Sequence, residues 1–317
     1  MTRFIADVHT HHATPSYPAV EPHNASTALV RRWDAIARRV ADVEDLLQES
    51  GAAGIDLRVL SAPPAMLAPP GGGGLARDDQ RRVNDALALT VASHPARLSG
   101  LGTVDAFGGD GAGAEVERCV RELGLPGVVV DCAAGGRLIS DPSARPALAA
   151  AAELGAPVFV HPVSVDSLTR EFAPLGRLGT SLARGSVNAA ALLSLLHDDV
   201  WAELPDLQVV FPMLGVAGLA LAAATDEGAI ISAQAPRGSR AHVYVDTMGF
   251  AAPAVRLAVA LLGADHVLVG SDWPIGERSA SRERVDRLLD DAGLDDADAR
   301  LVAGENARRL FGIDRAS

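Results

Sequence analysis

Cysteine is almost absent from this sequence of 317 residues, and no long hydrophobic run occurs in it. Only Cys119 and Cys132 are present, which excludes a disulfide framework and favours a reducing compartment. No apolar stretch approaches the ~20 uncharged residues of a membrane span. The expected first strand begins within a few residues of Met1, which leaves no room for a signal peptide. We therefore expect a cytoplasmic protein that does not bind membranes.

Positive charge is also in deficit. Lys and Arg together number 28 against 40 for Asp and Glu, so the formal net charge is −12. This charge argues against a nucleic-acid partner and leaves a small-molecule substrate as the expected ligand. With 48% hydrophobic residues the chain can bury a large core, and its length suits one α/β barrel of about 250 residues plus insertions. We expect a single domain over residues 1–317. Such a domain is compatible with a homodimer.

Short apolar or β-branched runs alternate with longer helical patterns along the chain. The expected strands are residues 4–9, 55–61, 98–104, 127–132, 157–161, 207–213, 242–247 and 267–271. The expected helices are residues 27–50, 78–92, 113–123, 144–154, 187–203 and 253–262. Eight strands alternating with helices predict a (β/α)8 TIM barrel. An open doubly wound sheet is the rival, but no G-x-G-x-x-G follows the first strand.

A His-x-His pair at the end of the first expected strand is the most informative motif. Residues two apart in a strand share a face, so His9 and His11 project together while Val8 and Thr10 face away. Two imidazoles on one face suit a transition metal or zinc. The alternative is a pair of surface histidines on an edge strand.

Other polar residues follow later strands of the expected barrel. Asp131 ends the fourth strand, His161 ends the fifth, and Asp272 follows the eighth. Barrel enzymes place their chemistry at these carboxyl ends. Three imidazoles and a carboxylate suit divalent zinc, iron or manganese.

Several motifs spread over nearly the whole chain carry a family resemblance. They are DVHTH (residues 7–11), HPARLSGLG (94–102), LGLPGV (123–128), VFVHP (158–162), GSDWP (270–274) and GENARRLF (304–311). The chain resembles the amidohydrolase superfamily, in the branch that contains aminocarboxymuconate semialdehyde decarboxylase. The resemblance implies an amidohydrolase-like TIM barrel in which His9, His11, His161 and Asp272 are the metal ligands.

One departure from the family pattern bears on the reaction. After the sixth strand the family carries a His-Gly-Gly-type turn whose His handles protons or binds metal, and here Met213 occupies that position. A thioether does not shuttle protons and is a poor ligand for a hard divalent ion. The usual decarboxylation or hydrolysis therefore lacks a principal proton-handling group, and the catalytic residue stays unknown.

Residues near the first strand offer a second metal site. His12, Glu21 and His23 lie near the His pair in sequence, and Asp131 lies where binuclear members of the superfamily often place a bridging ligand. The alternatives are an outward-facing His12, solvated loop residues at Glu21 and His23, and an Asp131 that only orients a ligand imidazole. Four arginines are candidates to receive an anionic substrate or are solvated side chains: Arg177, Arg184, Arg237 and Arg240.

The altered ligand set favours dioxygen chemistry, because histidine with carboxylate is the ligand mix of non-haem iron oxygenases. The chain is similar to a branch of this fold that holds two irons. That similarity implies a diiron monooxygenase of bacterial secondary metabolism that hydroxylates a hydrophobic acid or CoA-linked substrate, with O2 and an external reductant. Phe211, Met213 and Trp273 would then line the substrate pocket, or else pack the barrel. The alternatives are a mononuclear zinc- or manganese-dependent decarboxylase or hydrolase, and a metal-free relative.

Overall fold

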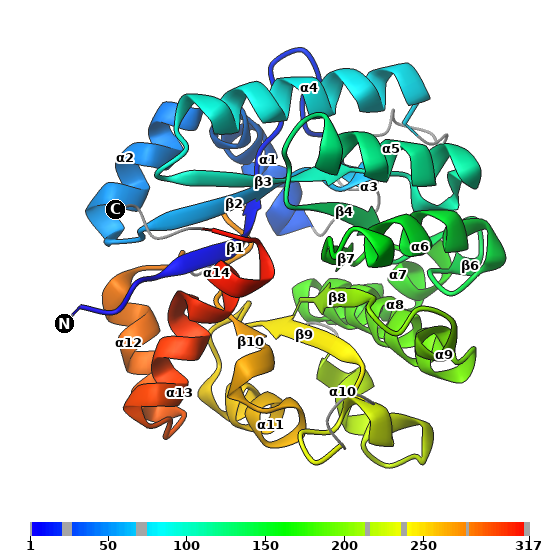
Figure 1. The fold of residues 1–317 in the computed structure, drawn as a ribbon. Helices are drawn as coiled ribbons and strands as arrows, with labels where there is room; N and C mark the ends of the chain where they lie inside the picture. Colours follow the sequence, from blue (N-terminus) through cyan, green and yellow to red (C-terminus); the bar gives the residue numbers. More distant parts are fainter. Residues whose placement is uncertain are drawn as a thin grey trace.

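Eight short apolar segments form a ring of parallel strands whose order around the ring is their order in the chain (Figure 1). In the computed structural model the described residues are 2–20, 27–67, 75–212, 216–235, 240–276 and 279–313. The strands of the ring are β1 (Ala6–His11), β2 (Leu57–Ser61), β3 (Leu98–Thr103), β4 (Gly127–Asp131), β7 (Val158–His161), β8 (Gln208–Phe211), β9 (His242–Asp246) and β10 (Val267–Leu268). The predicted (β/α)8 barrel is confirmed.

The ring closes between the first strand and the segment that follows the last one. The Val8 amide donates to the Val269 carbonyl at 2.8 Å, and the His11 amide donates to the Trp273 carbonyl at 2.8 Å. Closure leaves no free strand edge between these segments, and it brings residue 272 beside the His-x-His pair.

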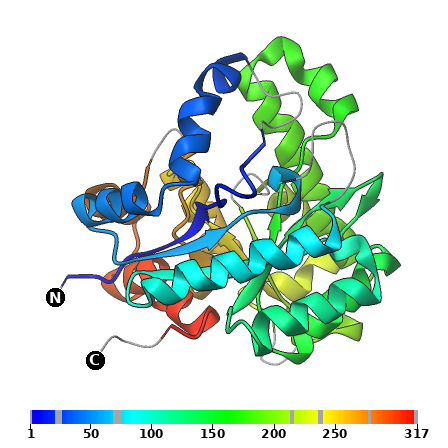
Figure 2. The ribbon, with the colours of Figure 1, turned by 90° about the horizontal axis from the view of Figure 1, so that it is seen from above.

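Helices surround the ring, and two of them extend past it at the end where the strands finish (Figures 1 and 2). The two are α1 (Thr27–Val40) and α8 (Arg177–His197). The other helices are α2 (Val43–Ala53), α3 (Pro64–Leu67), α4 (Arg77–Ser93), α5 (Asp110–Arg121), α6 (Arg145–Glu153), α7 (Asp166–Phe172), α9 (Val200–Glu203), α10 (Val216–Ala222), α11 (Ala252–Leu262), α12 (Arg282–Asp291), α13 (Asp296–Arg300) and α14 (Asn306–Leu310). A small hairpin of β5 (Ala133–Ala134) and β6 (Arg137–Leu138) follows β4.

The helix predicted over residues 27–50 is two helices. Asp42 separates them because its extended backbone ends the first, and its side chain accepts a hydrogen bond from the Asp45 amide at the start of the second. The helix predicted over 187–203 begins ten residues earlier and ends near Asp199, whose φ of 50° lies in the left-handed region.

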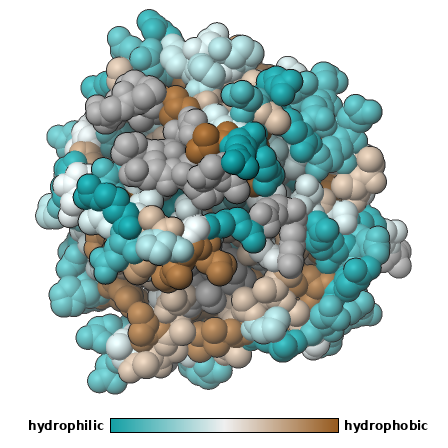
Figure 3. All heavy atoms as spheres, turned by 180° about the vertical axis from the view of Figure 1, so that it is seen from behind, coloured by the Kyte–Doolittle hydropathy of each residue, from teal (hydrophilic) through white to brown (hydrophobic). Residues whose placement is uncertain are grey.

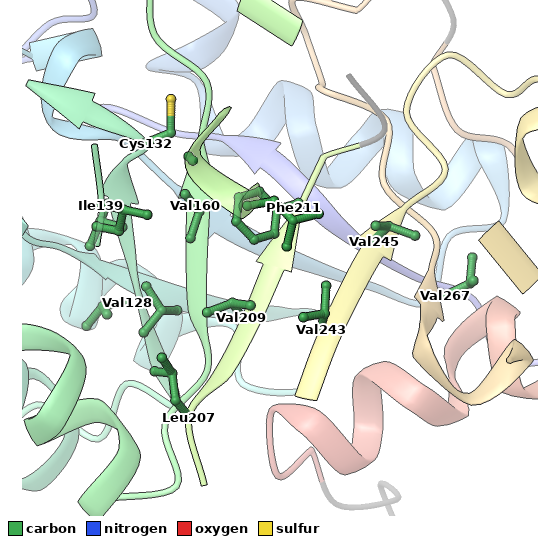
Figure 4. Packing of buried hydrophobic residues seen from close by; sticks show 14 of the residues in the cluster. Val128, Cys132, Ile139, Val160, Leu207, Val209, Phe211, Val243, Val245 and Val267 are labelled. Carbon is green, nitrogen blue, oxygen red and sulfur yellow. The ribbon is translucent and has the colours of Figure 1, made fainter. Parts of the chain in front are cut away.

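Two hydrophobic layers lie on either side of the strands. The inner cluster takes Ala6, Val8, Leu57, Val59, Leu101, Val129, Phe159, Val210 and Leu268 from seven strands, with Tyr244 of β9 packed against it. The alternate residues of the same strands pack in the larger outer cluster beneath the helices; Val128, Val160, Val209, Phe211, Val243 and Val245 are among them (Figure 4). Burial on both faces explains why these strands are apolar without alternation.

Strand β1 departs from regular alternation just below the His pair. Val8 lies in the inner cluster, contrary to the expectation that it faces away from the side of His9. The His9 ring also faces inward, with its centroid 4.9 Å from that of Phe159. Both residues point inward because the register between β1 and β2 shifts between Asp7 and Thr10. Because of this shift, β1 contributes Val8 to the inner hydrophobic cluster and His9 to the site at the end of the strands.

Among the described residues, none of the helices combines the length and the apolar composition of a membrane span. On the face opposite to that of Figure 1, apolar surface gathers near the centre with polar residues around it (Figure 3).

Candidate metal centre

Four side chains converge where the barrel strands end. His9 and His11 lie on β1, His161 ends β7, and Asp272 follows β10. One potential ligand atom from each lies within 4.8 Å of the other three. The ring centroids of His9 and His11 are 5.2 Å apart, those of His11 and His161 are 5.2 Å apart, and those of His9 and His161 are 5.7 Å apart. The four residues expected from sequence are thus brought together in a site that could hold a metal.

The direction of the nitrogen lone pairs fits a cation. His11 Nδ1 faces the Ser61 carbonyl at 3.4 Å, which can only accept, so this nitrogen carries the proton of the neutral ring. His11 Nε2 then presents a lone pair 2.9 Å from Asp272 Oδ1, an arrangement that a proton or a metal ion must bridge. Within the described chain, His9 Nε2 and His161 Nδ1 are buried without a hydrogen-bond partner. The donor set therefore suits a divalent ion.

His9 is oriented by a carboxylate on a distant strand. Its Nδ1 lies 2.7 Å from Oδ2 of Asp246, the last residue of β9, and both side chains are buried. A carboxylate only accepts, so Nδ1 donates and Nε2 faces Asp272 at 3.5 Å. Such a partner fixes the tautomer and raises the basicity of a ligand imidazole.

Glycine at position 270 makes room for that carboxylate. A Cβ at Gly270 would lie 2.6 Å from Asp246 Oδ2 and 2.7 Å from Asp246 Cβ, which no side chain tolerates. Two residues on, Asp272 has a φ of 62°, which is unfavourable for a residue other than glycine. The Gly276 amide donates to the Asp272 carbonyl at 2.6 Å and holds this turn. The GSDWP motif thus orients the Asp272 carboxylate and leaves space for that of Asp246.

Burial and nearby charges favour the neutral form of two of the imidazoles and the protonated form of the third. Burial, with the neighbouring His11 and Arg184, lowers the pKa of His161 well below its ordinary value. Burial also lowers the pKa of His11. Burial opposes the charged form of His9 too, but the Asp246 and Asp272 carboxylates outweigh it and raise the pKa of His9. In the metal-free protein, protons therefore compete for the site mainly at His9.

A buried ion pair braces the strand beneath the site. Asp7 accepts hydrogen bonds from the Arg58 guanidinium, the Ser271 hydroxyl and the Ser271 amide. Asp7 also accepts from the His9 amide at 3.2 Å. These contacts join β1, β2 and the segment after β10, so they fix His9 relative to Asp272.

Of the residues expected to form a second metal site, the two that the structure describes have other hydrogen-bond partners. His12 Nδ1 hydrogen-bonds to the Val40 carbonyl at 2.9 Å, and Asp131 Oδ2 accepts from the Ala65 amide at 2.9 Å. Neither joins the group of converging ligand atoms found in the described chain. Glu21 and His23 lie outside the described residues.

The three residues expected to line a substrate pocket differ in placement. Phe211 and Trp273 are buried in the outer cluster, each about 1% exposed. The Arg39 guanidinium lies 5.0 Å from the Trp273 ring centroid, on the helix side of the barrel wall. Met213 lies outside the described residues.

Two residues gain importance only in the structure. Asp246 was not a candidate, although its place at the end of the expected seventh strand was the available signal. Arg184 was one of four candidate arginines, and it acts electrostatically on Asp272 and Asp131. Its position about two turns inside a helix gave no reason to prefer it.

Comparisons with known proteins agree with this architecture. The family model described as amidohydrolase matches residues 6–313, which confirms the resemblance seen in the sequence. The 2-amino-3-carboxymuconate-6-semialdehyde decarboxylase of Dictyostelium discoideum is 28% identical over 74% of this chain and 67% of its own length. The gamma-resorcylate decarboxylase of a Rhizobium species is 28% identical over 90% of this chain and 91% of its own. A dihydroxybenzoic acid decarboxylase from Polaromonas sp. JS666, solved with manganese and 2-nitroresorcinol, superposes with a TM-score of 0.75 at 22% identity, covering 100% of this chain and 98% of its own.

The expectation of a diiron monooxygenase is wrong. The relatives named above are decarboxylases, and a further solved structure in this group is that of 2,6-dihydroxybenzoate decarboxylase. The inference from the position of Met213 to iron and O2 chemistry failed because it rested on one missing histidine, whereas the His3Asp set suits zinc or manganese as well as iron.

Proposed function

The chain belongs to the amidohydrolase family, and we propose that it is a metal-dependent decarboxylase of small aromatic carboxylic acids. The observation that carries the proposal is the set of three buried imidazoles, with unpartnered nitrogens on two of them, and one partly buried carboxylate at the carboxyl ends of the strands: His9, His11, His161 and Asp272. Relatives named as decarboxylases of resorcylate and carboxymuconate semialdehyde, which align over most of this chain, support the reaction class.

One divalent ion, manganese or zinc, is the proposed cofactor, and these four residues would hold it. Imidazole and carboxylate ligands suit both metals, and a manganese-bound neighbour of the same fold favours manganese. When bound, the ion supplies a positive charge that orients the acid and stabilises negative charge on it. His12 and Asp131 are left out of the proposed ligand set because neither belongs to the group of converging ligand atoms in the described chain.

The reaction needs no oxidant. The bond between the ring carbon and the carboxylate breaks, CO2 leaves without the bonding electrons, and a proton takes its place on that carbon. The protein contributes one positive charge at the mouth, on Arg184, and burial lowers the pKa of His161 and of His11, which favours their neutral forms. Low exposure of the three imidazoles limits water around the reacting acid.

The test is CO2 release by protein loaded with manganese or zinc, from a panel of hydroxylated and carboxylated benzoates, without O2. We expect release that is lost on chelation and restored by metal. Asp272→Ala and His161→Ala should bind metal at least about a hundredfold more weakly and lose activity, since each removes one of four ligands. His266→Ala, which removes a histidine at the opposite end of the barrel, is the control. Metal affinity in Asp272→Ala equal to that of the wild type would contradict the assignment.

A further inference from the structure

Among the candidate arginines that the structure describes, only Arg184 interacts electrostatically with the proposed metal ligands. Arg240 forms an ion pair with Asp265 at 3.3 Å, before the start of β10 and so at the far end of the barrel. Arg177 is exposed at the first turn of α8, and Arg237 lies outside the described residues. Arg184 remains.

The anchoring of α8 places Arg184 above His161. Asn188 donates from Nδ2 to the Val160 carbonyl at 3.0 Å, which fixes that level of the helix beside the end of β7. The chain after α8 returns to the start of β8, where Trp201 donates to the Leu207 carbonyl at 3.0 Å. The helix therefore runs opposite to the strands. Arg184 is four residues before Asn188, on the same helix face and about 6 Å nearer the mouth.

The charge of Arg184 is felt at three strand ends. It acts on Asp131 at the end of β4, on His161 at the end of β7 and on Asp272 after β10. Strands β4 and β7 are neighbours in the ring, and β10 lies three places further on, so the guanidinium lies over the mouth that they share. Within the described chain it makes no hydrogen bond and no ion pair with a carboxylate, and burial lowers its pKa. A partly buried cation without a hydrogen-bonded partner is unfavourable until an anion pairs with it.

We propose that Arg184 binds a second carboxylate of the substrate, one that the reaction retains, so that the preferred substrates are aromatic dicarboxylic acids. The proposal rests on the decarboxylase function proposed above. The retained group is the better partner because the reacting carboxylate loses its charge as CO2 forms. Pairing Arg184 with the reacting carboxylate would stabilise the ground state more than the transition state and would slow the reaction. A guanidinium matches a carboxylate with two parallel hydrogen bonds.

The experiment compares two probes, benzene-1,3-dicarboxylate and benzoate, by calorimetric titration of the manganese-loaded and metal-free protein. Both probes offer one carboxylate to the metal, so their difference isolates the second. The wild type should bind the dicarboxylate on the order of tenfold to a hundredfold more tightly. Arg184→Gln should abolish the difference, because it weakens binding of the dicarboxylate much more than binding of benzoate. Arg184→Lys, which keeps the charge without the planar fork, should show an intermediate preference.

Arg170→Gln is the matched control, because Arg170 is an exposed arginine on the neighbouring helix α7, and it should behave as the wild type. Manganese content and circular dichroism establish that each variant folds. The proposal is overturned if Arg184→Gln still prefers the dicarboxylate to benzoate, or if the wild type shows no such preference, even when the protein releases CO2. It is supported if the preference depends on Arg184, even when no tested acid is decarboxylated, so the two proposals fail separately.

Discussion

Replacing Asp246 by Asn tests how this protein aims a metal ligand without touching the ligands themselves. The two carboxylate oxygens of Asp246 face two donors, His9 Nδ1 at 2.7 Å and the Met248 amide at 2.9 Å. Asparagine has only one acceptor oxygen, so one donor must face its NH2 group. The variant therefore loses both the charge and the fixed tautomer at His9.

The expected loss of metal affinity is tenfold to a hundredfold, or about 1.4–2.7 kcal/mol. The Asp246 carboxylate raises the pKa of His9 despite the opposing effect of burial. It therefore also strengthens the competition of protons with the metal for His9. Asp246→Asn should lower that pKa, so the loss of affinity should be largest near pH 8 and smaller near pH 6. Wild-type affinity should fall as pH decreases through the raised pKa of His9, because only neutral His9 binds metal.

Competition with a chromophoric chelator, at several pH values, measures these affinities. The control is Asp265→Asn, because Asp265 contacts another histidine, His266, at 3.2 Å before β10, away from the metal ligands. That variant should bind metal as the wild type does. If Asp246→Asn retains wild-type affinity at pH 8, the reasoning about His9 orientation is refuted.

Three further substitutions probe the surroundings of the site. Gly270→Ala should weaken metal binding about as much as Asp246→Asn in the same competition assay, because the new Cβ would displace the Asp246 carboxylate; unchanged affinity would count against this. Arg58→Met should lower the free energy of unfolding in urea by about 3–5 kcal/mol, because it leaves Asp7 buried without its cation; a loss below about 1 kcal/mol would show that Asp7 is otherwise satisfied. Burial raises the pKa of Asp131 from 3.8 to about 7, so the folded metal-free protein holds a proton there that the unfolded chain releases. As the pH rises from 4 to 7, the free energy of unfolding of the wild type should therefore fall relative to that of Asp131→Asn, by up to about 1.4 kcal/mol per pH unit. Parallel pH profiles of the two proteins would contradict the shift.

The barrel could be predicted because its determinants are local. Parallel strands buried on both faces give continuous runs such as residues 128–130, and glycines such as Gly155, with a φ of 62°, mark where the next connection begins. The break at Asp42 was missed because the helical pattern continues across it, and only the cap geometry shows the interruption.

The four converging side chains could be predicted because strand ends meet at one mouth. The orienting role of Asp246 could not, because it depends on which strand lies opposite His9 in the closed ring. The inward position of Val8 could not either, because the register shift in β1 arises from pairing with β2. The reaction was wrongly predicted from Met213, a single residue, against a ligand set that all other motifs supported.

The most direct measurement of the central claim is release of labelled CO2 from carboxyl-¹³C aromatic acids under strict anaerobiosis, with manganese-loaded and chelator-stripped protein compared in D2O. We expect ¹³CO2 in equal amount to an aromatic product that carries one deuterium on the carbon that bore the carboxylate, only when metal is present, and at an undiminished rate without O2. Product formation that requires O2, or turnover that persists after the metal is stripped, would contradict the account.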